Sequence, residues 1–211
     1  MTHLEINHSP EPIRLFKSDL FEFFTHIHPA VVVAIWLPVS LYFLVGAIIW
    51  RVAEVWLHIP IGFVIGLLVW TLSEYLLHRF VFHFKPRVPW QERIVFLFHG
   101  IHHVQPQCKT RLVMPPAVSI PLSFVFYGAV YLVAAVALGA PHWVAPIFSG
   151  LIMGYLCYDL THYATHHWPM KGRYLKYLKK YHMLHHFKTP DARYGVSSPL
   201  WDFAFGTYPA D

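Results

Sequence analysis

Four long apolar segments alternate with polar segments along the 211-residue chain. Each has close to the roughly 20 residues that an α-helix needs to cross the hydrocarbon core of a membrane. Two of the segments carry no charged side chain, and the other two carry one each, Glu74 and Asp159, near their ends. The pattern therefore predicts four membrane-spanning helices, at about residues 30–50, 56–77, 116–138 and 143–160.

Short breaks join these helices in pairs. The second helix is expected to begin near Val55 or Pro60, because proline suits the first turn of a helix. Gly139 and Pro141 interrupt the chain between the third and fourth helices. We therefore expect an all-α fold with two membrane hairpins and a helical cap. The polar segments that form this cap are residues 1–29, 78–115 and 161–211, and residues 13–24 are expected to form an amphipathic helix at the membrane surface.

Composition and charge support this interpretation. Hydrophobic residues make up 56% of the chain and charged residues only 13%, whereas soluble domains carry about 25% charged residues. Of the 16 Lys and Arg residues, only Arg51 falls outside the three polar segments, so the positive-inside rule places those segments in the cytoplasm. The same rule explains the net charge of +5 without a nucleic-acid partner. Two cysteines are too few for a disulfide framework.

The polar segments are rich in histidine. The chain has 17 His residues but only 11 Asp and Glu residues. Eleven of the histidines form four clusters, and residues three and four apart share one face of a helix. His78 and His83 are five apart, about 140° around a regular helix, so they bind one centre if the helix ends between them, or otherwise two different metals. The clusters are His78 and His83; His99, His102 and His103; His162, His166 and His167; and His182, His185 and His186.

This spacing predicts metal binding. Neutral imidazole is the commonest metal ligand in proteins, and about ten ligands exceed the roughly four to six that one ion takes, so two ions are implied. Imidazole accepts zinc, copper, iron or nickel. Zinc has no redox chemistry, and an all-histidine pair at a membrane surface suggests oxygen chemistry on a lipid C–H bond. The six other histidines are interpreted as ordinary polar groups: His3, His8, His26, His28, His58 and His142.

Two carboxylates and two tyrosines are candidate supporting residues. Glu74 lies four residues before His78, and Asp159 lies three before His162, so each is predicted to hold a histidine N–H. The alternative is a snorkelling or capping charge. Tyr155 and Tyr158 either line the site or belong to the aromatic belt of the membrane interface.

The clusters and their flanking residues resemble a known family. The matching strings are RLFKSD (14–19), EYLLHRFVFH (74–83), HGIHH (99–103), RLVMPP (111–116), YLCYDLTH (155–162), YHMLHHF (181–187) and GVSSPLWD (195–202). They are similar to the fatty acid hydroxylase superfamily of membrane histidine-box oxygenases, and within it to the fatty acid 2-hydroxylases. Sterol or carotenoid oxidases and desaturases of the same superfamily are an alternative, and a membrane metal-binding or transport protein is a second.

The resemblance implies one hydroxylase domain over residues 1–211, with a four-helix base under a cap that holds two metal ions. Iron is expected in the active enzyme, although zinc can replace it in a purified sample. The implied reaction uses O2 and two electrons to hydroxylate carbon 2 of a long acyl chain, in a fatty acid or a ceramide. The implied ligands are His78, His83, His99, His102, His103, His162, His166, His182, His185 and His186, with His167 less secure.

The resemblance also has departures. Eukaryotic relatives often begin with a fused cytochrome b5, but only about 29 residues precede the first helix, so we expect no haem here. A separate electron donor is implied, such as a cytochrome b5 or ferredoxin with its reductase, in a bacterial inner membrane or an endoplasmic reticulum. Cys108 stands where the family often has Asp. The basic residues that would either dock an acidic donor or lie near lipid headgroups are Lys171, Arg173, Lys176, Lys179 and Lys180.

Overall fold

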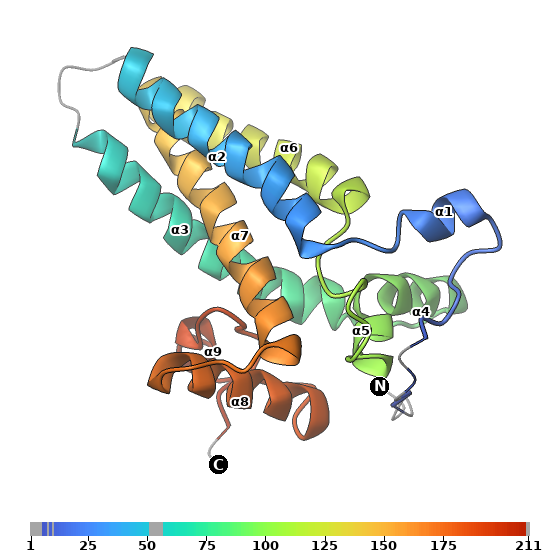
Figure 1. Cartoon of the computed structure of the whole chain (residues 1–211). Coiled ribbons are helices and arrows are strands. Elements are labelled where there is room, and N and C mark those ends of the chain that lie inside the picture. Colours follow the sequence, from blue (N-terminus) through green and yellow to red (C-terminus); the bar gives the residue numbers. More distant parts are fainter. Residues whose placement is uncertain (1–5, 8, 10, 51–56, 210–211) are drawn as a thin grey trace. The chain divides into compact units, whose positions relative to one another are not determined.

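The computed structural model describes residues 6–7, 9, 11–50 and 57–209, and these residues form helices and loops without a strand. Nine α-helices are described, together with three π-helical turns and one 3-10 turn (Figure 1). The elements are α1 (Asp19–Phe23), α2 (Pro29–Trp50), α3 (His58–Leu76), η1 (Leu77–Phe82), α4 (Pro89–Val95), η2 (Phe96–Gly100), α5 (Ile101–Val104), α6 (Pro116–Tyr131), η3 (Leu132–Ala137), η4 (Pro141–Trp143), α7 (Val144–His167), α8 (Arg173–Phe187) and α9 (Leu200–Ala204).

Four helical stretches are long and apolar enough to cross a membrane: Pro29–Ile49, His58–Phe82, Pro116–Ala137 and Pro141–His167. The predicted all-α class with four such helices is confirmed. The expected start of the second helix at residue 55 or 56 lies outside the described residues. Two helices continue further than the apolar pattern indicated, since π-helical η1 extends the second and α7 reaches His167. Both extensions carry histidines of the predicted clusters.

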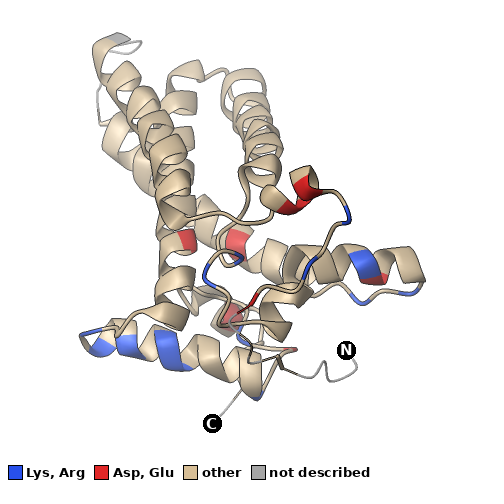
Figure 2. Cartoon of the chain, turned by 45° about the vertical axis from the view of Figure 1, so that its right-hand side comes forward, with Lys and Arg blue, Asp and Glu red and all other residues tan. Residues whose placement is uncertain are grey.

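The chain divides into two compact units. Unit 1 comprises the described parts of residues 1–28, 72–113 and 158–211, and unit 2 comprises those of residues 29–71 and 114–157. Every described charged side chain belongs to unit 1, whereas the helices of unit 2 carry none (Figure 2). Unit 2 is therefore the apolar part of the molecule, and unit 1 holds the histidine clusters.

Close helix contacts build unit 2. A Cβ atom added at Gly66 would lie 2.0 Å from the Ile147 carbonyl oxygen, and one at Gly150 would lie 2.0 Å from that of Phe63. The backbones of α3 and α7 therefore touch, as small residues allow in membrane helix pairs. The Ser40 hydroxyl, on α2, lies 3.0 Å from the carbonyl oxygen of Ser149 on α7.

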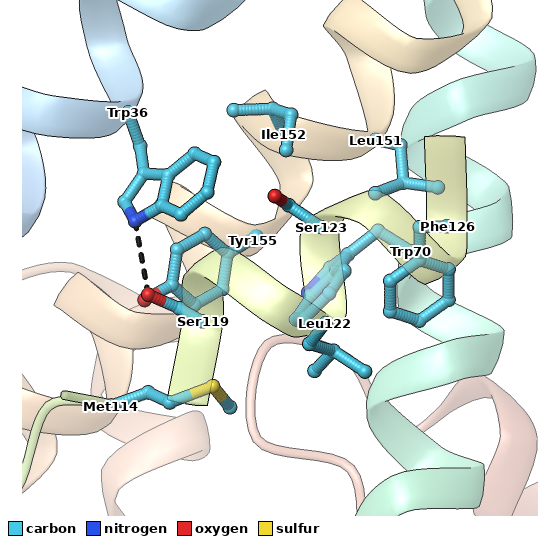
Figure 3. Close-up of a pocket in the computed structure, with 10 residues that line it drawn as sticks. All are labelled: Trp36, Trp70, Met114, Ser119, Leu122, Ser123, Phe126, Leu151, Ile152 and Tyr155. Carbon is cyan, nitrogen blue, oxygen red and sulfur yellow. Dashed lines mark hydrogen bonds between the residues drawn. The ribbon is translucent and has the colours of Figure 1, made fainter. Parts of the chain in front are cut away.

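Unit 2 also contains an apolar hollow of about 250 Å³, which includes space open to solvent (Figure 3). Aromatic rings of α2, α3, α6 and α7 surround it, and the Trp36 indole N–H donates to the Ser119 hydroxyl at 3.2 Å. The lining residues are Trp36, Trp70, Met114, Ser119, Leu122, Ser123, Phe126, Leu151, Ile152 and Tyr155.

The N-terminal segment of unit 1 corrects one prediction. The expected amphipathic helix over residues 13–24 is only the short α1. Residues 13–18 are not helical, because the Glu22 carboxylate accepts the backbone N–H groups of Leu15 at 2.9 Å and Phe16 at 2.8 Å. These bonds turn the segment back on α1. The apolar side chains of α1 remain exposed, including Phe21 at 61% and Phe23 at 70%, which agrees with the expected surface position.

Candidate metal centre

The ten histidines expected to bind metal come together in two groups of five. In each group, one ring nitrogen from every residue lies within 4.8 Å of the others. His167 belongs to neither group. The first group is His78, His83, His99, His103 and His185, and the second group is His102, His162, His166, His182 and His186.

A π-helical turn places His78 and His83 in the same group. The backbone N–H of His83 donates to the His78 carbonyl at 3.0 Å, which is the i to i+5 bond of a π-helix. Residues five apart are therefore one turn apart here, rather than 140° apart as in a regular helix. This turn brings both rings into one group without a helix end between them.

Two of the three histidine triplets divide between the groups. His99 and His103 join the first group and His102 joins the second. On α8 the pair one turn apart, His182 and His186, joins the second group, whereas His185 joins the first. Residues four apart differ by about 40° around a helix and residues three apart by about 60° in the opposite sense. Each of these triplets therefore contributes rings to both groups, rather than presenting all three rings to one group.

The nitrogen contacts in the second group cannot all be hydrogen bonds. The Nε2 of His102 lies 2.9 Å from those of His162 and His186. The Nε2 of His182 lies 2.9 Å from that of His166 and 3.0 Å from that of His186. A ring nitrogen that carries hydrogen donates one hydrogen bond and cannot accept, and a ring nitrogen without hydrogen accepts through one lone pair. Each nitrogen can therefore take part in one such bond, so four hydrogen bonds among these five nitrogens are impossible. A cation shared by their lone pairs removes the conflict.

In the first group, two backbone carbonyls determine which ring nitrogen of His78 and His185 keeps its lone pair. The Nδ1 of His78 donates to the Tyr194 carbonyl at 2.5 Å, and the Nδ1 of His185 donates to the Ala192 carbonyl at 2.7 Å. In a neutral imidazole this leaves the lone pair on Nε2. The His78 Nε2 lies 3.1 Å from that of His99, and the His185 Nε2 lies 3.1 Å from that of His83. The lone pairs therefore face the interior of the group, as metal ligands require.

Electrostatics keeps the rings neutral. Burial lowers the pKa of His185 to about 4. Burial, followed by repulsion from neighbouring imidazoles, holds the pKa of His99, His102 and His182 well below the ordinary value of 6.5. At neutral pH these rings are in the form that binds metal. The donor set is imidazole nitrogen alone, which suits iron, copper, nickel or zinc.

The structure gives Glu74 a partner that was not predicted. Its carboxylate is buried and accepts the backbone N–H groups of Val196 at 2.5 Å and Ser197 at 2.8 Å, and it also accepts the Ser197 hydroxyl. The expectation was that Glu74 holds the N–H of His78 or of a neighbouring histidine. For His78 it is wrong, because the Tyr194 carbonyl accepts that hydrogen, and for a neighbouring histidine it stays a prediction. Glu74 instead holds the segment that supplies this carbonyl.

The other three candidate supporting residues have different surroundings. Asp159 is 1% exposed, and its role beside His162 stays a prediction. Tyr158 is buried and stacks on His162 with ring centres 5.9 Å apart, so it lies at the edge of the second group. Tyr155 packs edge-on against Trp36 and Trp70 at 5.8 and 5.2 Å, which places it in the aromatic lining of the hollow in unit 2.

Histidines outside the clusters and other singled-out residues have ordinary surroundings. His26 lies 2.7 Å from the Thr110 hydroxyl, and His58 contacts His142 edge-on with ring centres 5.1 Å apart. His3 and His8 lie outside the described residues. Cys108 is buried, with its sulfur 3.7 Å from the Thr110 hydroxyl.

Four basic residues at or near the N-terminal half of α8 are exposed: Lys171, Arg173, Lys176 and Lys180. The ribbon of this helix is blue at its Lys and Arg positions in Figure 2. Lys179 is half-buried and donates to the Trp168 carbonyl at 3.1 Å. These positions agree with a basic surface on α8.

Four membrane-length helices and two groups of five histidines that could each hold a metal ion define the class of this membrane protein. The sequence model of the fatty acid hydroxylase family matches residues 63–207, and the chain belongs to this family. It is 41% identical to the dihydroceramide fatty acyl 2-hydroxylase FAH2 of Arabidopsis thaliana, over 93% of this chain and 80% of that protein. It is 37% identical to the fatty acid 2-hydroxylase of Homo sapiens, over 95% of this chain and 58% of that protein.

A solved structure agrees with this assignment. The structure is described as full-length scs7p with only the hydroxylase domain visible. It is 39% identical in sequence, with a TM-score of 0.82, and the match covers 92% of this chain and 71% of that one. The resemblance to fatty acid 2-hydroxylases predicted from the motifs is therefore confirmed, and so is the fold class.

Proposed function

We propose that this chain is a membrane-bound di-iron oxygenase that hydroxylates carbon 2 of a long acyl chain, in a fatty acid or a ceramide. The observation that supports the proposal is the pair of five-histidine groups, whose Nε2 contacts cannot all be hydrogen bonds. The names of the relatives supply the substrate class, since they are fatty acid and dihydroceramide 2-hydroxylases. The whole chain, residues 1–211, is proposed to act as one hydroxylase domain.

The residues have separate tasks in this proposal. The ten grouped histidines hold two ions through Nε2, and burial of His78, His102 and His182 keeps water from competing for them. The chemistry that bound redox metals supply is activation of O2 and abstraction of the hydrogen on carbon 2. The reaction balances when O2, two electrons and two protons convert the C–H bond to C–OH and release one water. Iron is proposed because zinc cannot accept these electrons.

The electrons are proposed to come from a separate protein, such as a cytochrome b5 or a ferredoxin with its reductase. The exposed Lys171, Arg173 and Lys176 support an acidic docking partner. We also propose that the histidine groups face the cytoplasm, in a bacterial inner membrane or an endoplasmic reticulum, because almost all Lys and Arg residues belong to the segments that carry them.

The apolar hollow of unit 2 is proposed to take part of the acyl chain. Its lining is aromatic and aliphatic, with two serine hydroxyls (Figure 3), as pockets for apolar ligands usually are. Tyr155 on α7 is one of the lining residues.

Expression in a host that lacks 2-hydroxy acyl lipids tests the proposal. We expect mass spectrometry to find 2-hydroxy acyl chains, and the purified protein to hold two iron ions per chain. His102→Ala and His185→Ala should each abolish the product, whereas His142→Ala, outside both groups, should retain it. An active protein without stoichiometric iron would contradict the proposal. Altered cellular metal content with unaltered lipids would instead indicate metal transport.

A further inference from the structure

The two histidine groups differ in how their rings are held. In the first group, His78 and His185 donate their Nδ1 hydrogens to the carbonyls of Tyr194 and Ala192. In the second group, the buried Nδ1 atoms of His102, His182 and His186 have no hydrogen-bond partner among the described residues, and in the first group the same holds for His83 alone. One short segment, residues 192–197, therefore orients two ligands of the first group.

Two buried carboxylates hold this segment. Glu74, on α3, accepts the N–H groups of Val196 and Ser197. Asp202, on α9, is 0% exposed and accepts the N–H groups of Tyr194 at 2.9 Å and Gly195 at 2.7 Å. Four consecutive N–H groups thus donate to two carboxylates from different helices. Hydrogen bonds to charged acceptors are the stronger kind.

The backbone of the segment shows that its shape is imposed. Arg193 has a positive φ of 61°, which non-glycine residues adopt at a cost and which clusters at functional sites. It stands between the two residues whose carbonyls accept the histidine hydrogens. A Cβ atom on Gly195 would lie 2.0 Å from the Ser198 carbonyl oxygen and 2.9 Å from Asp202 Oδ2. The close approach of the Ser198 backbone therefore requires glycine at this position.

We propose that Glu74 and Asp202 are positioning residues that clamp residues 192–197, so that this segment directs His78 and His185 toward the first metal position and leaves the second unaffected. The carboxylates contact no metal in this arrangement. They act through the two backbone carbonyls, which fix the hydrogen on Nδ1 and the lone pair on Nε2. Such outer contacts change metal affinity by roughly 10- to 100-fold. The inference rests on the proposed metal centre and adds that its two ions are held unequally.

The test measures metal retention rather than activity. Wild-type protein loaded with cobalt is dialysed against increasing chelator, and bound metal per chain is determined together with the cobalt absorption spectrum. In Glu74→Ala and Asp202→Ala, one ion per chain should be lost at roughly 10- to 100-fold lower chelator activity than in wild type. The spectral component that disappears should be the one lost in His103→Ala, from the first group, and not the one lost in His182→Ala.

Controls keep the result unambiguous. Glu92→Ala removes an exposed carboxylate of unit 1 and should leave both ions in place. If Glu74→Ala does not fold, two milder variants replace it in the same measurement. Glu74→Gln keeps one acceptor oxygen, and Thr207→Val removes the hydroxyl that donates to Asp202 at 2.7 Å. Folded variants that retain both ions as wild type does, or that weaken both equally, would overturn the clamp. A wild-type protein that binds no metal would instead overturn the proposed function.

Discussion

For single residues, the hydrogen bonds that a side chain already makes determine which of its atoms can face the site. The His78 and His185 rings each use Nδ1 on a backbone carbonyl, so only Nε2 remains to face the group. Glu74 was expected beside a histidine because of its spacing, but a carboxylate accepts any N–H within reach, and the backbone of residues 196 and 197 is closer. Spacing on a helix limits the candidates for a contact without selecting the partner.

An ion pair between Arg111 and Glu22 stabilises unit 1. The Arg111 guanidinium, with a side chain 3% exposed, contacts the Glu22 carboxylate and the Ile13 carbonyl. Burial raises the pKa of Glu22, but the N–H groups of Phe16 and Leu15 and the charge of Arg111 outweigh it and lower this pKa below 4.5. The pair therefore connects the N-terminal segment to residues far along the chain.

We predict that Arg111→Met destabilises the protein by about 3 kcal/mol at pH 7, because it leaves the Glu22 carboxylate without its counter-ion. A group with a lowered pKa stabilises the fold above its ordinary value and loses that effect as the pH falls. The wild type should therefore lose stability below pH 4.5, and the variant should lose less. Thermal unfolding in detergent at pH 7 and pH 4 measures both, and an equal acid loss in the two proteins would contradict this.

At the scale of elements, helix geometry controls which histidines meet. The π-turn η1 brings residues five apart onto one face, and the pairs four apart on α7 and α8 share a group. The close approach of α3 and α7 in unit 2 depends on glycine at the crossing. In both cases the path of the backbone determines which residues meet, more than the identity of the surrounding side chains does.

Gly150→Ala should destabilise the protein by about 3 kcal/mol or more, because its Cβ atom would lie 2.0 Å from the Phe63 carbonyl oxygen and force the helices apart. Gly128, on α6, has no atom within 4 Å of its added Cβ, so Gly128→Ala is the matched control and should be neutral or slightly stabilising. Thermal unfolding of both variants in detergent distinguishes them. A Gly150→Ala protein as stable as the control would contradict direct backbone contact.

At the scale of the whole molecule, the chain divides its chemistry between two units. The described charges and both histidine groups belong to unit 1, and the apolar hollow belongs to unit 2. Such a division suits an enzyme whose substrate is mostly hydrocarbon but whose reaction needs metal and electrons. The proposal that the hollow takes part of the acyl chain can be tested separately from the metal centre.

Ser123→Phe should fill the hollow and reduce 2-hydroxylation of long acyl chains by roughly tenfold, about 1.4 kcal/mol in the barrier, without changing bound metal. The matched control is Val125→Phe, on the same helix at a side chain 66% exposed, which should keep wild-type activity. Mass spectrometry of the acyl chain lengths and metal analysis provide the two measurements. An unchanged product profile in the Ser123 variant would exclude the hollow as an acyl site.

The number of membrane helices, the helical class and the ten histidines that gather were predictable from the residues alone, because apolar length and residue type are local properties. Packing between distant segments fixed how those histidines divide into two groups, what Glu74 and Asp202 hold, and that residues 13–18 leave the helix. Backbone carbonyls such as those of Ala192 and Tyr194 are the same in every residue and carry no sequence signal. Which of them meets a given imidazole depends on packing between segments more than 100 residues apart, such as His78 and Tyr194.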